Sequence, residues 1–126
     1  MVGTKEKPLT WIGSAREDLR QFPIEARRRA GFESRAVQRG DEPSNFKPMP
    51  IVGPGTYELR LQTDDAYRVF YIAKFQEAVY VLHAFQKKTQ KISKRDIALG
   101  QQRYDAAQCA HRFQQAATKH PGPARQ

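Results

Sequence analysis

An apolar segment that passes without a break into a cluster of lysines most constrains the fold of this chain. Residues 78–91 read AVYVLHAFQKKTQK, and His83 is the titratable side chain within the apolar part. Short runs rich in β-branched and aromatic residues are typical of strands rather than of helices. The segment therefore predicts a buried strand over residues 78–86 with positive charge at its end.

Two further strand-like segments come directly before this one. Residues 57–62 alternate apolar and polar side chains, which is the period of a strand with one buried face. Residues 67–74 are apolar on both faces except for Arg68 and Lys74, and short turns separate the three segments. Strands joined in this way usually pair with their neighbours in sequence, so we expect an antiparallel meander.

Side chains of a strand point alternately to the two faces of its sheet. One face of the third strand is expected to carry Val79, Val81, His83, Phe85 and Lys87. Lys88 falls on the other face. The strand must therefore end or twist near Gln86 if Lys87 and Lys88 are to reach one common ligand.

A first strand and a helix hairpin are expected before the meander. Residues 9–12 form a short apolar run, and Ser14 after it can cap a helix that reaches about residue 22. Residues 23–38 begin with a proline, which the first turn of a helix tolerates, and Gly40 is a typical helix stop. We expect the two helices to form an antiparallel hairpin.

A loop and a final helix flank the meander. Residues 41–55 contain four prolines and two glycines, so they are expected to form a loop. Ser93 and Asp96 have the spacing of a capping box. A C-terminal helix should therefore begin at Lys94.

These segments together predict an α+β fold. Its small antiparallel sheet consists of a strand, a helix hairpin and a three-stranded meander, followed by the C-terminal helix. A chain of 126 residues fits one domain. We place that domain at residues 7–113 and expect residues 1–6 and 114–126 to be flexible.

Positive charge is concentrated in the last third of the chain. The whole sequence has 22 Lys+Arg against 13 Asp+Glu, a net charge of +9. Residues 83–126 contain nine Lys/Arg and two Asp, and so account for +7 of it. Such clustering indicates a polyanionic partner, with nucleic acid ahead of a membrane surface. The sequence has neither a membrane-spanning run nor a signal peptide, so we expect a cytoplasmic protein.

Cysteine and histidine give no support for a metal site. Cys109 is the single cysteine, so an intramolecular disulfide is impossible. His83, His111 and His120 do not have the spacing of metal ligands. We therefore expect chemistry without a metal or another cofactor.

The order of elements and three sequence runs resemble the RelE/HigB superfamily of type II toxins, and within it the phage-derived HigB-like branch. The runs are KPMPIVGPGTYELR, YRVFYIAKFQEAVYVLHAFQKKTQK and the helix that follows. The resemblance covers about residues 7–107, and HAFQKKTQK is its most specific part. It implies a RelE-like fold and a small endoribonuclease that cleaves messenger RNA, often on the ribosome. It also implies an acidic helix-turn-helix antitoxin as partner.

The same resemblance suggests which cations contact RNA. Arg68 matches the arginine that stabilises the phosphate, and Lys88 matches a second cation after the last strand. Lys87 belongs to the same motif, and Lys91 continues the lysine cluster. Lys47, in the proline-rich loop, is a further RNA-binding candidate. Lys87 and Lys88 can instead be charges that protect the end of a strand.

The sequence gives less information on which residues transfer protons than on which cations contact RNA. Glu58 and Arg60 occupy strand positions where RelE has basic residues, so Glu58 departs from the pattern and is a candidate general base. The RelE tyrosine beyond the last strand has no counterpart here, which leaves His83 as an alternative by residue type. His83 can also be an ordinary half-buried histidine. Glu58 can likewise form a salt bridge with Arg68, a role compatible with catalysis.

Two other functions remain open at this point. One is a ParE-like toxin that inhibits DNA gyrase on the same fold. The other is a non-catalytic nucleic-acid-binding protein of phage origin.

Overall fold

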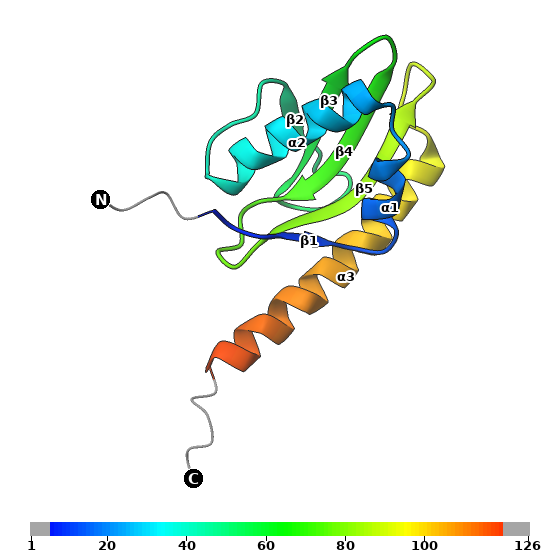
Figure 1. Ribbon diagram of the computed structural model, residues 1–126. Helices are drawn as coiled ribbons and strands as arrows, with labels where there is room; N and C mark the ends of the chain where they lie inside the picture. The colour runs from blue at the N-terminus through cyan, green and yellow to red at the C-terminus, as the bar shows by residue number, and fades with distance from the viewer. Residues whose placement is uncertain (1–5, 120–126) are drawn as a thin grey trace, which may run out of the picture.

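The computed structural model describes residues 6–119, which form a five-stranded sheet with helices on both faces (Figure 1). In chain order the elements are β1 (Leu9–Trp11), α1 (Ala15–Arg20), α2 (Ile24–Gln38), β2 (Phe46–Pro48), β3 (Thr56–Gln62), β4 (Ala66–Ile72), β5 (Val79–Lys87) and α3 (Lys94–Lys119). The fold is α+β, as predicted, and is consistent with a RelE-like fold. The expected meander is present as β3, β4 and β5.

The sheet is mixed and larger than the sequence indicated. Its strand order is β1-β5-β4-β3-β2, and β1 pairs with β5 in parallel. The segment 41–55, expected to be a loop throughout, contains the short strand β2, in which Lys47 lies opposite Glu58. Proline is tolerated in β2 because it is an edge strand, and Pro48 is its last residue.

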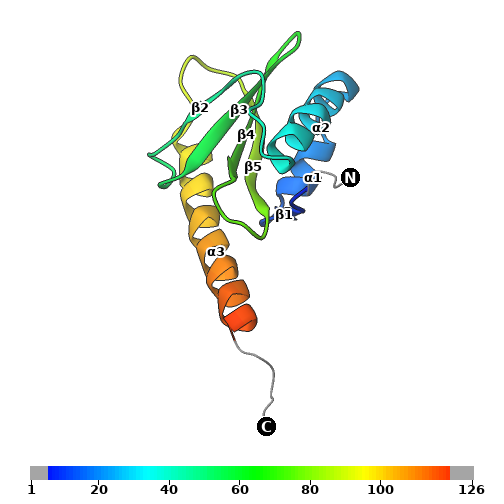
Figure 2. The same ribbon diagram turned by 90° about the vertical axis from the view of Figure 1, so that its left-hand side faces the viewer.

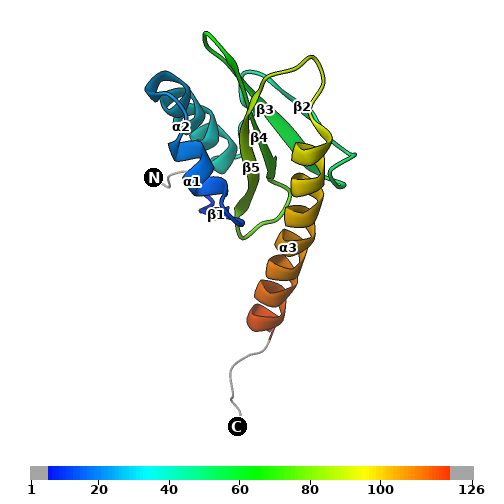
Figure 3. The ribbon, with the colours of Figure 1, turned by 90° about the vertical axis from the view of Figure 1, so that its right-hand side faces the viewer.

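The sheet separates two layers of helices. Figures 2 and 3 show α1 and α2 against one face and α3 across the other. The core under α1 and α2 includes Ala26, Leu61 and Val81. The core under α3 includes Phe70, Leu82 and Tyr104. None of the helices within residues 6–119 is long and apolar enough to cross a membrane.

A β-bulge in β5 changes which side chains share a face. His83 lies opposite Phe70 of β4, but Val81 lies opposite the very next residue of β4. Leu82 is therefore an extra residue on β5, which interrupts the alternation of side chains. Val79 and Val81 lie in the core under α1 and α2, whereas His83 bonds to α3. The prediction that His83, Phe85 and Lys87 share a face with Val79 and Val81 was wrong for this reason.

Helix α3 begins at the predicted residue. The backbone N–H of Asp96 donates to Ser93 Oγ at 3.1 Å, and Ser93 Oγ donates to Asp96 Oδ2 at 2.8 Å. The helix extends beyond the sheet at its C-terminal end (Figure 1). Residues 114–119, expected to be flexible, belong to it. The rest of that predicted tail lies outside the described residues.

The segment between β2 and β3 packs tightly against α3. Tyr104 Oη donates to the carbonyl oxygen of Pro54 at 2.7 Å. At Gly53, a Cβ atom would lie 2.4 Å from the Tyr104 ring. Glycine is therefore required at Gly53 so that the backbone can approach the ring closely.

We predict that Gly53→Ala destabilises the protein, because the added methyl group overlaps the Tyr104 ring. Overpacking of this kind should lower the free energy of unfolding by about 1–3 kcal/mol, measured by urea denaturation. Gly31→Ala on α2 is the matched control, since its Cβ would meet nothing within 4 Å. It should raise stability by about 0.5–1 kcal/mol through helix propensity. Equal midpoints for Gly53→Ala and wild type would contradict this packing.

Candidate functional site

A carboxylate and two guanidinium groups meet on the face of the sheet that α3 only partly covers. Glu58 Oε2 lies 3.3 Å from Arg68 Nε, and Glu58 Oε1 lies 3.4 Å from Arg60 Nε. The strand register creates this group, because Arg60 is opposite Arg68 and Glu58 is two residues before Arg60. The salt bridge between Glu58 and Arg68 that the sequence suggested is therefore present.

Glu58 and Arg68 of this group are buried, and the group is not fully hydrogen-bonded. The side chain of Glu58 is 1% exposed and that of Arg68 is 9% exposed. Within residues 6–119, Glu58 Oε1, Arg60 Nε and Arg68 Nε find no hydrogen-bond partner in spite of the short ion-pair distances. Burial lowers the pKa of Arg68, an effect that the charge of Glu58 opposes. Buried charges with unfilled hydrogen bonds are unusual. The side chain of Arg60, at 36% exposed, is the part of the group that an anionic ligand can reach most readily.

Further cations surround the triad Glu58, Arg60 and Arg68. Lys47 is exposed and lies opposite Glu58 in the neighbouring strand, so the two residues share a face. Phe85 lies opposite Arg68, and Lys87 is two residues beyond Phe85 on the same face. A row of charged side chains therefore crosses from β2 to β5.

The remaining predicted lysines lie where β5 ends. Lys87 Nζ donates to the carbonyl oxygen of Gln90 at 2.6 Å. The chain therefore turns back towards the end of β5 at this point. Lys87, Lys88 and Lys91 line a small pocket of about 170 Å³ in front of the first turn of α3. The structure thus brings the lysines into one cluster at the end of the strand that contains Phe85, the partner of Arg68.

His83 lies behind this face and has two polar partners. Its Nε2 is 2.7 Å from Asp96 Oδ1, and its Nδ1 is 3.4 Å from Arg103 Nη1. Because a guanidinium can only donate, Nδ1 is the acceptor and Nε2 carries the proton that is donated to Asp96. The imidazole in this arrangement is neutral, and burial lowers its pKa.

Sequence reasoning missed Arg103 and the network that it forms with α1. Arg103 Nη2 donates to Ser14 Oγ at 3.0 Å, and Ser14 Oγ donates to Asp18 Oδ2 at 2.7 Å. The sequence did contain one signal, since Asp96 and Arg103 are seven residues apart and so share a face of α3. The five residues Ser14, Asp18, His83, Asp96 and Arg103 form a network that joins α1, β5 and α3.

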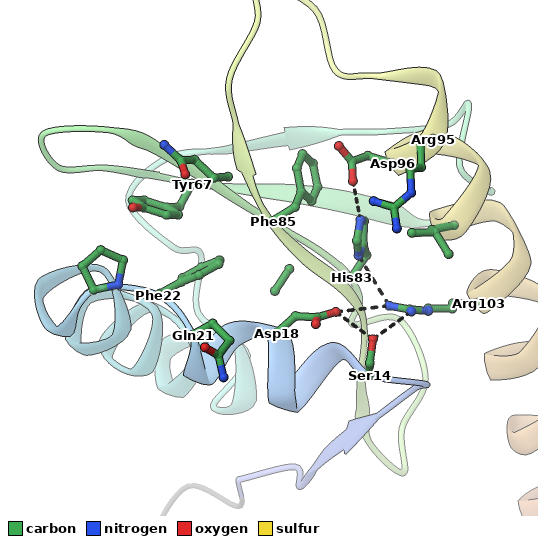
Figure 4. Close-up of a pocket in the computed structure, with 14 residues that line it drawn as sticks. Ser14, Asp18, Gln21, Phe22, Tyr67, His83, Phe85, Arg95, Asp96 and Arg103 are labelled. Carbon is green, nitrogen blue, oxygen red and sulfur yellow. Dashed lines mark hydrogen bonds and ion pairs between the residues drawn. The ribbon is translucent and has the colours of Figure 1, made fainter.

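A pocket of about 440 Å³ opens beside this network. Figure 4 shows Phe22, Tyr67 and Phe85 on one side of the pocket and Arg95, His83 and Asp96 on the other. Among residues 6–119, no group of three His, Cys, Asp or Glu side chains is placed to hold a metal ion.

We predict that His83 makes the stability of the protein depend on pH. Its pKa in the unfolded chain is near 6.5, and burial holds the folded value lower. The unfolded state therefore binds more protons below about pH 6.5, so stability is full above this pH and falls as the pH drops. His83→Gln should lose less stability than wild type between about pH 7.5 and about pH 5.5, as measured by urea denaturation. Parallel pH profiles for the two proteins would show that His83 has an ordinary pKa.

A comparison with models of known protein families identifies the family of this chain. A model of the family described as phage-derived protein Gp49-like (DUF891) matches residues 17–105, which include β2 to β5 and the capped start of α3. No curated protein matches the chain. The matched range contains the triad and the lysine cluster. The chain therefore belongs to the phage-derived Gp49-like family, a family of RelE/HigB-like toxins.

Proposed function

We propose that this protein is the toxin of a type II toxin–antitoxin pair of the HigB-like branch, and that it cleaves messenger RNA on the ribosome without a metal ion. The family supports the toxin role. The observation that carries the proposed reaction is the triad: two arginines, one 36% and the other 9% exposed, share one carboxylate within a row of charged side chains. A phosphodiester can satisfy both arginines at once.

The proposed reaction needs a base and a cluster of cations. A 2′-hydroxyl gives its proton to the base and attacks the adjacent phosphorus, the bond from phosphorus to the 5′-oxygen breaks, and the leaving oxygen takes up a proton from water. Arg68 and Lys88 stabilise the charge that develops on the phosphate oxygens. Lys47, Arg60, Lys87 and Lys91 hold the flanking RNA.

Hydrogen bonding favours Glu58 over His83 as the base. Both ring nitrogens of His83 are engaged, one as donor to Asp96 and one as acceptor from Arg103. Glu58 Oε1 makes no hydrogen bond among the described residues and lies on the same face as Arg68, and its ion pair with Arg60 at 3.4 Å must open before it can accept a proton. In this proposal Glu58 accepts the proton, and His83 keeps β5 and α3 in place.

The charge of the protein supports the proposed partners. A net charge of +9 favours both RNA and an acidic helix-turn-helix antitoxin. The antitoxin would neutralise the cations that bind the phosphates.

We predict that wild-type protein arrests growth on expression and produces new RNA ends inside translated codons. Arg68→Ala should reduce cleavage by about 100-fold or more, because a preorganised cation at the phosphate is removed. Mapping of RNA ends after induction measures this effect.

Controls must separate lost catalysis from lost folding. Removal of Arg68 alone leaves Glu58 buried and less well paired, which can cost about 3–5 kcal/mol. The double variant Arg68→Gln with Glu58→Gln removes both charges and should melt close to wild type yet remain inactive. Arg112→Gln, an exposed arginine in the C-terminal half of α3, is the matched control for charge and should stay fully toxic. Undiminished cleavage in both Arg68 variants, or DNA damage without RNA cleavage, would refute the proposal. The second result would indicate a gyrase inhibitor.

The salt dependence of RNA binding provides an independent prediction. If Lys88 contacts a phosphate, Lys88→Ala should lower the slope of log K against log salt by about 0.7, the value for one contact on a single strand. Filter binding with an uncleavable 2′-deoxy-substituted RNA measures the slope. Arg112→Gln should leave it unchanged, and an unchanged slope in Lys88→Ala would remove Lys88 from the interface.

A further inference from the structure

The pocket between α1, β5 and α3 contains groups that the proposed reaction does not use. Its volume of about 440 Å³ lies within the range of about 300–1,000 Å³ that is typical of small-molecule sites. The pocket at the lysine cluster, at about 170 Å³, is below that range. The larger pocket therefore has room for a group the size of a nucleotide. The smaller pocket can only contact the surface of such a group.

The pocket combines an apolar wall with unused polar groups. The rings of Phe22 and Tyr67 pack together, with their centroids 4.6 Å apart, and form the apolar side. The side-chain amides of Gln21 and Gln86 and the guanidinium of Arg95 also line the pocket. None of these three groups has a hydrogen bond or ion pair with another residue of the range 6–119.

The hydrogen-bonded network holds one side of the pocket in place. It fixes the spacing between α1 and α3, because Arg103 bonds to Ser14 of the α1 cap and to His83 of β5. Gly13 allows this contact: it has φ of +58°, and a Cβ there would lie 2.8 Å from Arg103 Nε. A ligand would meet a preformed cavity, which lowers the entropy lost on binding.

The pocket is continuous with the proposed cleavage face. Phe85 and Gln86 line both this pocket and the pocket of the lysine cluster. Arg68 lies opposite Phe85, and its Nη1 donates to the carbonyl oxygen of Tyr67 at 3.0 Å. RNA whose phosphates contact the lysine cluster would therefore lie beside the mouth of this pocket, although Tyr67, next to Arg68 in β4, points to the opposite face of the sheet.

We propose that this pocket receives one unstacked base of the RNA and thereby sets the base preference of the protein. The base lies against Phe22 and Tyr67, the amides of Gln21 and Gln86 read its edge, and Arg95 holds the adjoining phosphate. Amides suit this task because each offers both a donor and an acceptor, as base edges do. The inference rests on the proposed ribonuclease function and adds to it a site of specificity.

The first test compares the sequences around mapped RNA ends. In the double variant Gln21→Ala with Gln86→Ala, the preference for one base at the cuts that are made should weaken by about tenfold. Gln102→Ala is the matched control, since its amide is exposed on α3 and does not line the pocket. A base preference equal to that of wild type in the double variant would overturn the proposal and leave the ribonuclease function intact.

The second test measures binding without cleavage. The four ribonucleoside 5′-monophosphates are titrated separately into wild-type protein and followed by NMR. One of them should bind at least several-fold more tightly than the others, and Arg95→Ala and the double variant should both weaken it. If wild-type protein discriminates between mononucleotides but cuts no RNA, the base-specific pocket is supported and the proposed ribonuclease activity is refuted. Equal binding of all four by wild type would overturn the base-specific pocket.

Discussion

One buried imidazole lies at the centre of the hydrogen bonds that join α1, β5 and α3. His83 reaches α3 because the bulge at Leu82 turns it away from the face that carries Val81. Its two nitrogens then bind Asp96 and Arg103, and Arg103 extends the contact to Ser14. Three local features thus place the side chains of one set of hydrogen bonds. They are the bulge, the capped start of α3 and the glycine turn before α1. The candidate site and the pocket both lie beside it.

The triad on β3 and β4 differs from this network because its members are charged and incompletely hydrogen-bonded. The carboxylate of Glu58, 1% exposed, and the guanidinium of Arg68, 9% exposed, have lost most of their water, and ion-pair distances of 3.3 and 3.4 Å to the two arginines only partly replace it for Glu58. Apolar residues of similar size would often stabilise such a position as well or better. The retention of charge in a buried strand is the pattern of a site that gives up stability for binding.

Local patterns predicted most of the fold, and contacts between distant segments account for the rest. The meander, the helix start at Lys94 and the pairing of Glu58 with Arg68 follow from periodicity, capping and neighbouring strands. The bulge at Leu82 does not, because it is set by pairing with β4 rather than by the residues of β5. Similarly, the partners of His83 come from α3 and cannot be inferred from its own strand.

The sheet ends on both sides in strands of only three residues, β1 and β2. Long unpaired edges allow copies of a protein to join strand to strand. Here Pro48 removes a donor from one edge, while Lys7 places its ammonium group 2.6 Å from the carbonyl oxygen of Ala73 beside the other. The two edge strands themselves therefore offer few free backbone groups to a second copy of the protein.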